Sequence, residues 1–308
     1  MPSMKNGSPT LPASPSAPSA PKAYFLASRP KTWIASLSPV FIGAAMAPHV
    51  DMFTFLLTLL FSLAIQIGTN FANDYFDFIN GADTNLRKGP KRATQEGWIA
   101  PSSMLIATLI IFACALLIAI PLMIIAGFWS LLLAAACVAF GILYTGGPKP
   151  LGYLGLGELL VFVFFGPIAC CGTYFLQTGV VDMQIFLSSL APGFLSCSIL
   201  IANNLRDEKS DRIANKRTLI VRFGRKFGQW EYTLSILFAA IIPWVLVSVY
   251  EAPLQLLSAS LIAVAAIPCI KKVFRFKDPL ELIFVLQSSA FILLLYTTLF
   301  LYGLWSFS

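Results

Sequence analysis

Nine runs of hydrophobic residues, each close to the length that crosses a bilayer as a helix, constrain the fold of this chain most. Only 11% of its 308 residues are charged, whereas about a quarter are charged in a typical water-soluble domain. The sequence therefore predicts an all-α, polytopic membrane protein with about nine transmembrane helices. The expected spans are residues 33–50, 53–73, 104–126, 128–145, 156–176, 185–203, 232–250, 254–270 and 282–305.

Positive charge is confined to alternate connections between these runs. All 21 Lys and Arg residues lie in the N-terminal segment or in the connections 74–103, 146–155, 204–231 and 271–281. Because cytoplasmic loops are enriched in Lys and Arg, we predict that the N-terminus faces the cytoplasm and the C-terminus faces outward. The net charge of +7 follows from this asymmetry, so it does not indicate a nucleic acid partner. No pattern predicts an oligomeric state.

The first 23 residues differ from the rest of the chain. They are rich in Pro, Ser and Ala and contain no hydrophobic run of their own. Such a segment cannot bury enough apolar surface to fold, so we expect residues 1–23 to be a disordered cytoplasmic tail. Residues 24–308 then form a single membrane domain.

Two short acidic clusters stand at the cytoplasmic ends of the second and sixth runs. Residues four apart on a helix lie one above the other, so each cluster presents a face of oxygen atoms. Carboxylate and amide oxygens suit Mg²⁺, which proteins commonly hold together with substrate phosphates. The predicted magnesium ligands are Asn70, Asn73, Asp74 and Asp77 in the first cluster, and Asn203, Asp207 and Asp211 in the second. The alternative is that these residues simply face water at helix ends.

Each acidic cluster is followed by basic residues. A diphosphate bound through Mg²⁺ needs further cations to neutralise its remaining charge, and Lys and Arg supply them. The predicted diphosphate ligands are Lys88, Lys91, Arg92, Lys149, Arg206, Lys216 and Arg222. For any single cation, the alternative is the ordinary basic character of a cytoplasmic loop.

A glycine-rich connection, residues 144–158, joins the fourth and fifth runs. Its five glycines predict tight turns and close approach of backbone segments. Tyr144 and Glu158 flank this connection and should reach the same cytoplasmic mouth, where Tyr75 follows Asp74. If the diphosphate belongs to a polyprenyl substrate, its loss leaves an allylic cation that can react with an aromatic acceptor. We then expect Tyr75, Tyr144 and Glu158 to stabilise that cation or to contact the acceptor. For the aromatic residues the alternative is packing against lipid, and for the glycines it is a purely structural turn.

The sequence resembles the UbiA-type superfamily of intramembrane prenyltransferases over about residues 24–305. The family's Asn-Asp-x-x-Asp motif is matched by Asn73, Asp74 and Asp77, and its Asp-x-x-x-Asp motif by Asp207 and Asp211. The similar stretches also include residues 28–33, 89–92, 144–158 and 211–219. Within the superfamily, the segment Asn203–Asp207 is most similar to the branch that prenylates 1,4-dihydroxy-2-naphthoate in menaquinone synthesis.

The resemblance implies helices around a central cavity that opens to the bilayer, and Mg²⁺ as the cofactor. It also implies two substrates, a polyprenyl diphosphate and an aromatic acceptor, with Asp74, Asp77, Asp207 and Asp211 as catalytic residues. For this branch it implies loss of CO₂ and formation of demethylmenaquinone in a bacterial cytoplasmic (inner) membrane.

Two alternatives remain open. The first is prenylation of another aromatic acceptor, such as 4-hydroxybenzoate, homogentisate or a tetrapyrrole. The second is a lipid or ion transporter, whose acidic residues would lie near the middle of the membrane in broken helices. The acidic clusters here lie at span ends instead, and this favours the enzyme.

Overall fold

All regular elements of the described part of the chain are helices, which confirms the predicted all-α class. The computed structural model describes residues 17–82, 89 and 91–305. The helices are α1 (Ala20–Ala27), α2 (Trp33–Ala45), α3 (Met52–Ile79), α4 (Pro101–Ala126), α5 (Phe128–Leu143), α6 (Gly157–Val163), α7 (Ala169–Thr178), α8 (Met183–Ile213), α9 (Leu219–Phe223), α10 (Arg225–Tyr250), α11 (Ile262–Ala265), α12 (Ile267–Arg275) and α13 (Leu282–Trp305). Short 3-10 helices occupy Pro30–Thr32, Leu151–Leu154, Leu254–Leu261 and Pro279–Glu281.

Seven of the described helical segments are long and apolar enough to cross a bilayer. They are Met52–Ile79, Pro101–Ala126, Gly157–Thr178, Met183–Ile213, Arg225–Tyr250, Leu254–Arg275 and Pro279–Trp305. The predicted spans 33–50 and 128–145 form the shorter helices α2 and α5, of 13 and 16 residues. A count of nine spans therefore remains a prediction, as does the orientation of the N-terminus.

Large apolar side chains cover much of the outer surface. Ile124, Trp129 and Trp305 are 77–79% exposed, and many Leu, Ile and Phe side chains are about half exposed. A surface this apolar is unfavourable in water and favourable against lipid tails. The exposed side chains thus agree with the hydropathy of the helices, and both indicate an integral membrane protein.

Helix α8 is the most buried of the long helices, with 72% of its hydrophobic window inside the structure. It packs against α2, α6, α10 and α13. The segment α6–α7 contains a π-helical turn at Phe164–Ile168, where Pro167 has no N–H to donate to the preceding turn. Beside this turn, Gly166 lies against Gly193 of α8, and a Cβ built on Gly193 would lie 2.9 Å from the backbone oxygen of Phe162. The glycine pair allows α6–α7 and α8 to approach closely.

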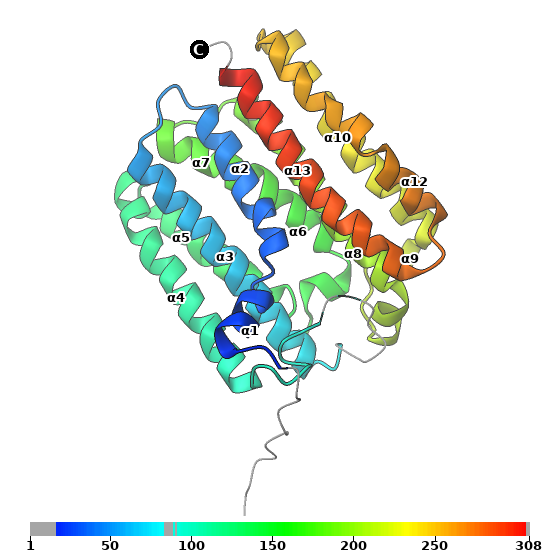
Figure 1. Ribbon diagram of the computed structural model, residues 1–308. Coiled ribbons are helices and arrows are strands. Elements are labelled where there is room, and N and C mark those ends of the chain that lie inside the picture. Colours follow the sequence, from blue (N-terminus) through cyan, green and yellow to red (C-terminus); the bar gives the residue numbers. More distant parts are fainter. Residues whose placement is uncertain (1–16, 83–88, 90, 306–308) are drawn as a thin grey trace, which may run out of the picture.

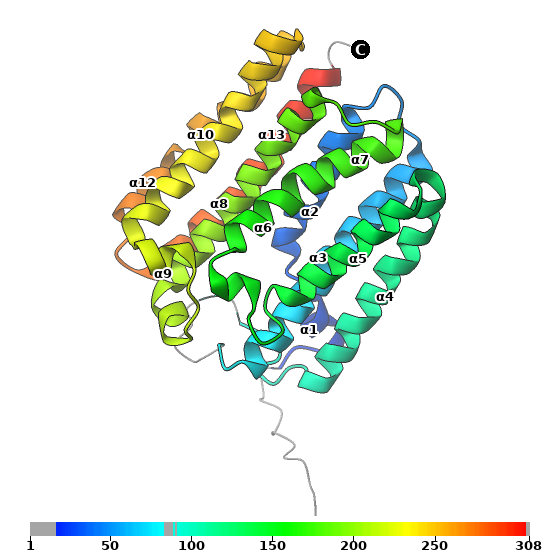
Figure 2. The same cartoon turned by 180° about the vertical axis from the view of Figure 1, so that it is seen from behind.

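The two acidic clusters lie at the same end of the bundle. Figure 1 shows the C-terminal ends of α3 and α8 near α1 and α9, whereas the C-terminal end of α13 lies at the opposite end. Figure 2 shows the same arrangement from behind, with α6 and α7 on the near side. The bundle therefore brings together two motifs that are more than a hundred residues apart in sequence.

Candidate active site

A cavity of about 640 Å³ extends from the acidic ends of α3 and α8 into the apolar interior of the bundle. Its polar end contains carboxylates, amides and cations from several elements. Its deeper walls are mainly Leu, Ile, Val and Phe side chains from α2, α3, α5, α6, α7 and α8. The lining residues at the polar end include Asn73, Asp77, Arg92, Tyr144, Thr145, Tyr153, Asn203, Asp207, Asp211 and Lys216. A charged head group and a long hydrocarbon tail would each find a matching environment here.

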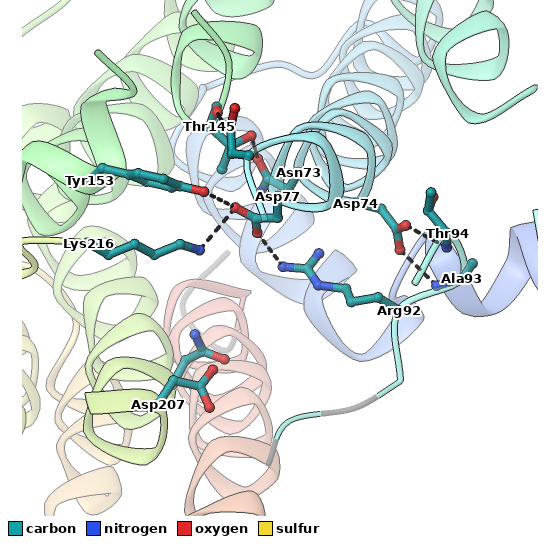
Figure 3. A network of polar contacts seen from close by, with 12 residues as sticks. Asn73, Asp74, Asp77, Arg92, Ala93, Thr94, Thr145, Tyr153, Asp207 and Lys216 are labelled. Carbon is teal, nitrogen blue, oxygen red and sulfur yellow. Dashed lines mark hydrogen bonds and ion pairs between the residues drawn. The ribbon is translucent and has the colours of Figure 1, made fainter. Parts of the chain in front are cut away.

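Asp77 is the centre of the polar network at this end (Figure 3). Its carboxylate accepts hydrogen bonds from Arg92 Nη2 at 2.8 Å, Tyr153 OH at 2.7 Å and Lys216 Nζ at 3.0 Å. The Asp77 residue is only 2% exposed, so the two cations compensate the charge that burial would otherwise make costly. Lys216 also lies 4.6 Å from the centre of the Tyr153 ring.

Asp74 lies one turn earlier on α3 and has a different environment. Its two carboxylate oxygens accept hydrogen bonds from the backbone N–H groups of Ala93 and Thr94, at 3.0 and 2.9 Å. Asp74 does not line the cavity, and Figure 3 shows its side chain directed away from Asp77. In this arrangement Asp74 holds the segment that carries Arg92.

The two asparagines of the first cluster both line the cavity. Asn73 Oδ1 accepts a hydrogen bond from Thr145 Oγ1 at 2.8 Å. Asn70 Nδ2 donates to the backbone oxygen of Ser28 at 2.9 Å and to Thr32 Oγ1 at 3.3 Å. The α3 cluster thus connects the N-terminal segment with the loop after α5.

In the second cluster, Arg206 pairs with two of its neighbours on α8. Arg206 donates to both carboxylate oxygens of Asp207, at 2.8 and 2.6 Å, and to Asn203 Oδ1 at 2.6 Å. Asn203, Asp207 and Asp211 line the cavity, whereas the buried Arg206 does not. Arg206 therefore neutralises Asp207 and orients Asp207 and Asn203 from outside the cavity.

The remaining predicted diphosphate ligands lie away from the cavity or outside the described residues. Lys91 is exposed and pairs with Glu96, and Lys149 is also exposed. Arg222 donates to the backbone oxygens of Leu154 and Arg217, so it fixes the loop that carries Tyr153. Lys88 lies outside the described residues. Arg92 and Lys216 are the predicted phosphate ligands that line the cavity among the described residues.

The three residues predicted to contact a cation or acceptor are separated by the fold. Tyr144 lines the cavity, and Gly157 leaves room for it, because a Cβ there would lie 3.0 Å from the Tyr144 hydroxyl. Glu158 instead faces α8, where it accepts a hydrogen bond from Asn204 Nδ2 at 2.8 Å. Tyr75 packs against Phe76 and does not line the cavity. The close approach predicted for the glycine-rich loop is thus present around Tyr144.

Several cavity residues were not among the sequence predictions. They include Arg29, Thr32, Gln66, Thr145, Tyr153 and Asn204. Arg29 could have been noticed as a cation directly before the first span, and Tyr153 as a second tyrosine of the glycine-rich loop. Gln66 is a single polar residue on an apolar helix and Thr145 is a single hydroxyl in the loop after α5, so neither carries a comparable signal.

The oxygen atoms at the polar end fit Mg²⁺. Asn73, Asp77, Asn203, Asp207 and Asp211 all line the cavity and offer only carboxylate and amide oxygens, the hard ligands this ion prefers. Within the described residues, no three acidic, His or Cys side chains already converge as a metal site. Asp77 pairs with Arg92 and Lys216, and Asp207 pairs with Arg206. Mg²⁺ ions that share their coordination with substrate phosphates would need only some of these oxygen atoms.

Comparison with known proteins agrees with this geometry. Residues 36–295 match the UbiA prenyltransferase family. A 1,4-dihydroxy-2-naphthoate octaprenyltransferase from Mycobacterium tuberculosis is 39% identical over 243 residues, covering 75% of this chain and 83% of that protein. The protein of the same name from Escherichia coli is 32% identical over 297 residues, covering 92% of this chain and 95% of that protein.

The fold has a close counterpart among solved structures. A UbiA homolog from Archaeoglobus fulgidus, bound to GPP and Mg²⁺, matches with a TM-score of 0.64 at 17% identity. The match covers 90% of this chain and 99% of that chain. The resemblance inferred from the two acidic motifs is therefore confirmed, and this chain belongs to the UbiA prenyltransferase family.

Proposed function

We propose that this protein transfers a polyprenyl group from polyprenyl diphosphate to 1,4-dihydroxy-2-naphthoate. The reaction releases diphosphate and CO₂, gives demethylmenaquinone and depends on Mg²⁺. The observation that carries the proposal is the single cavity that joins an oxygen-rich, cation-flanked end to an apolar interior. The names of the Mycobacterium tuberculosis and Escherichia coli relatives support this choice of acceptor.

The α3 and α8 faces would hold the diphosphate between them. Mg²⁺, when bound by Asn73, Asp77, Asn203, Asp207 and Asp211, supplies positive charge that stabilises the departing diphosphate. Arg92 and Lys216 line the same end and can exchange their ion pairs with Asp77 for phosphate oxygens. Because these groups are preorganised by the fold, little reorganisation is needed as negative charge develops on the leaving group.

The deeper cavity would protect the allylic cation. Its walls are built mainly from apolar side chains, so water that would quench the cation is largely excluded. The aromatic ring of Tyr144 lies at the junction between the polar end and these walls, where its π face can stabilise positive charge. The prenyl tail would occupy the apolar part, which lies among helices with lipid-facing outer surfaces.

We further propose that the polar mouth faces the cytoplasm of a bacterial inner membrane. The Lys and Arg residues are concentrated in connections at this end and absent from the alternate connections. A diphosphate and an ionised naphthoate could then reach the site from the cytoplasmic side.

A defined reconstitution tests the proposed function. The purified protein in lipid nanodiscs is incubated with Mg²⁺, octaprenyl diphosphate and carboxyl-labelled 1,4-dihydroxy-2-naphthoate. The expected result is a product of the mass of demethylmenaquinone, with one labelled CO₂ released per product and no product when EDTA is present. Parallel reactions contain 4-hydroxybenzoate or homogentisate as acceptor. A prenylated product from one of these, with none from the naphthoate, would reject the proposed acceptor.

A further inference from the structure

We propose that Gln66 recognises a ring hydroxyl of the aromatic acceptor, an inference that rests on the proposed function. Gln66 lies on α3, is only 7% exposed and lines the cavity. Its Oε1 atom is buried and has no hydrogen-bond partner among the described residues. A buried carbonyl oxygen without a donor is unfavourable, so this atom indicates a ligand that supplies one.

The contacts of Thr32 determine which atom of the Gln66 amide is available. Thr32 Oγ1 donates its hydrogen to the backbone oxygen of Arg29 at 2.9 Å. It can therefore only accept from Gln66, whose Nε2 lies 3.1 Å away, and from Asn70 Nδ2 at 3.3 Å. Because Thr32 has no second hydrogen to donate, the amide nitrogen of Gln66 faces Thr32 and the carbonyl oxygen remains for the ligand.

The position of Gln66 separates it from the diphosphate site. It precedes Asn73 by seven residues on the same helix, which places it about 10 Å deeper along α3 at 1.5 Å per residue. On α8, Ser196 likewise precedes Asn203 by seven residues. Ser196 also lines the cavity, and its buried hydroxyl has no partner among the described residues. The deeper cavity thus has polar groups on two walls that the phosphate ligands do not use.

The chemistry of the two substrates decides which one Gln66 contacts. The prenyl tail is a hydrocarbon and has no hydrogen-bond donor. The ionised diphosphate has acceptor oxygens, which a carbonyl oxygen would repel. Of the proposed substrates, the dihydroxynaphthoate is the one that carries O–H donors, so Gln66 Oε1 accepts from one of its hydroxyls. This contact would orient the ring and discriminate against acceptors that lack the hydroxyl.

The contact is tested by changing Gln66 and the ligand hydroxyls separately and together, and comparing the binding affinities. The ligands are 1,4-dihydroxy-2-naphthoate, 1-hydroxy-2-naphthoate and 4-hydroxy-2-naphthoate, and the measurement is equilibrium binding by ligand fluorescence in nanodiscs. For the wild type, we expect loss of one of the two hydroxyls to weaken binding about tenfold, the effect of one hydrogen bond of about 1.4 kcal/mol. In Gln66→Met that difference should vanish, because the partner of the hydroxyl has been removed.

Controls separate recognition from folding. Ser62→Ala changes a cavity residue one turn deeper on α3. The Ser62 hydroxyl already donates to the backbone oxygen of Ser36, so the tenfold difference in affinity between the ligands should remain. The affinity of Gln66→Met for octaprenyl diphosphate should match the wild type. If that affinity is lost, Gln66→Asn is used in place of Gln66→Met. This variant keeps the amide but is one methylene shorter, so it should reduce the tenfold difference.

The outcomes are distinct. If loss of a ligand hydroxyl weakens binding equally in wild type and in Gln66→Met, Gln66 does not recognise that hydroxyl, whichever reaction the protein catalyses. Binding of the naphthoate without turnover overturns the proposed reaction, while the binding cycle still tests Gln66. If the wild type binds no naphthoate, the same cycle is run with 4-hydroxybenzoate and benzoate. Failure to bind any hydroxylated aromatic overturns both proposals.

Discussion

The acidic clusters of α3 and α8 have similar sequences but are stabilised in different ways. Asp77 is paired with groups from three other segments, namely Arg92, Tyr153 and Lys216. Asp207 is paired with its own neighbour, Arg206, on the same helix. The α3 cluster therefore organises the loops around the cavity, whereas the Arg206 contact holds Asp207 from within α8. Removal of the Asp77 charge should therefore disturb all three of these segments, and removal of the Asp207 charge should release Arg206 on α8.

The largest effect is expected for Asp77→Asn and Asp207→Asn. Each should lower prenyl transfer by at least about 10²-fold, since each removes charge from the proposed diphosphate site. Breaking a buried ion pair also costs about 3–5 kcal/mol, so both variants should unfold at lower temperature.

Hydrogen exchange distinguishes the two variants. Asp77→Asn should increase exchange in residues 91–96, 151–155 and 216–218, whereas Asp207→Asn should increase it at the end of α8, where Arg206 loses its partner. Equal exchange patterns would contradict the difference drawn between the clusters.

Arg92→Ala should have the next largest effect. Arg92 lies in the cavity beside Asp77, so its loss should raise the KM for prenyl diphosphate at least about tenfold. Lys91→Ala is the matched control, because Lys91 is adjacent in sequence but exposed and paired with Glu96. Its KM should stay within about twofold of wild type, since exposed ion pairs contribute little.

Asp74→Asn separates two roles for this residue. The amide retains one oxygen for the N–H groups of Ala93 and Thr94, so we expect transfer to fall about tenfold through loss of one charge-assisted hydrogen bond. If Asp74 acts through this loop, the Mg²⁺ concentration for half-maximal rate should not change. A large rise in that concentration would instead identify Asp74 as a metal ligand.

The smallest effect is expected for Tyr153→Phe. It removes one hydrogen bond to Asp77 and keeps the aromatic ring beside Lys216. A net hydrogen bond contributes about 0.5–1.5 kcal/mol, so kcat/KM should fall about two- to tenfold. A loss as large as that of Asp77→Asn would show that the hydroxyl has a direct chemical role.

The sequence was sufficient to predict features that depend on local pattern. Hydrophobic runs predicted the all-α class, and the spacing of Asn73, Asp77, Asn203 and Asp207 placed these residues on helix faces that line one cavity. Features that depend on distant segments were less accessible. The direction of Asp74 depends on the backbone of Ala93 and Thr94, and that of Glu158 depends on Asn204.

Cations were the hardest group to assign from sequence. Arg206 and Arg92 both lie close to acidic residues in the sequence, yet Arg206 is buried outside the cavity lining and Arg92 lines the cavity. Their positions depend on side-chain pairing in three dimensions, which spacing along the chain does not encode. Helix lengths were also difficult, because α2 ends at Ala45 although hydrophobic residues continue beyond it.

The contact between Gly166 and Gly193 has a consequence for the width of the apolar part of the cavity. A methyl group at Gly166 would meet the backbone oxygen of Ser189 at 2.8 Å, and one at Gly193 would meet that of Phe162 at 2.9 Å. Backbone atoms cannot rotate away as side chains can, so the helices would have to separate as rigid bodies. Val161 and Phe165, which line the cavity from α6 and the π-helical turn, would then move together. One added methyl group should thus widen the cavity where Val161 and Phe165 line it.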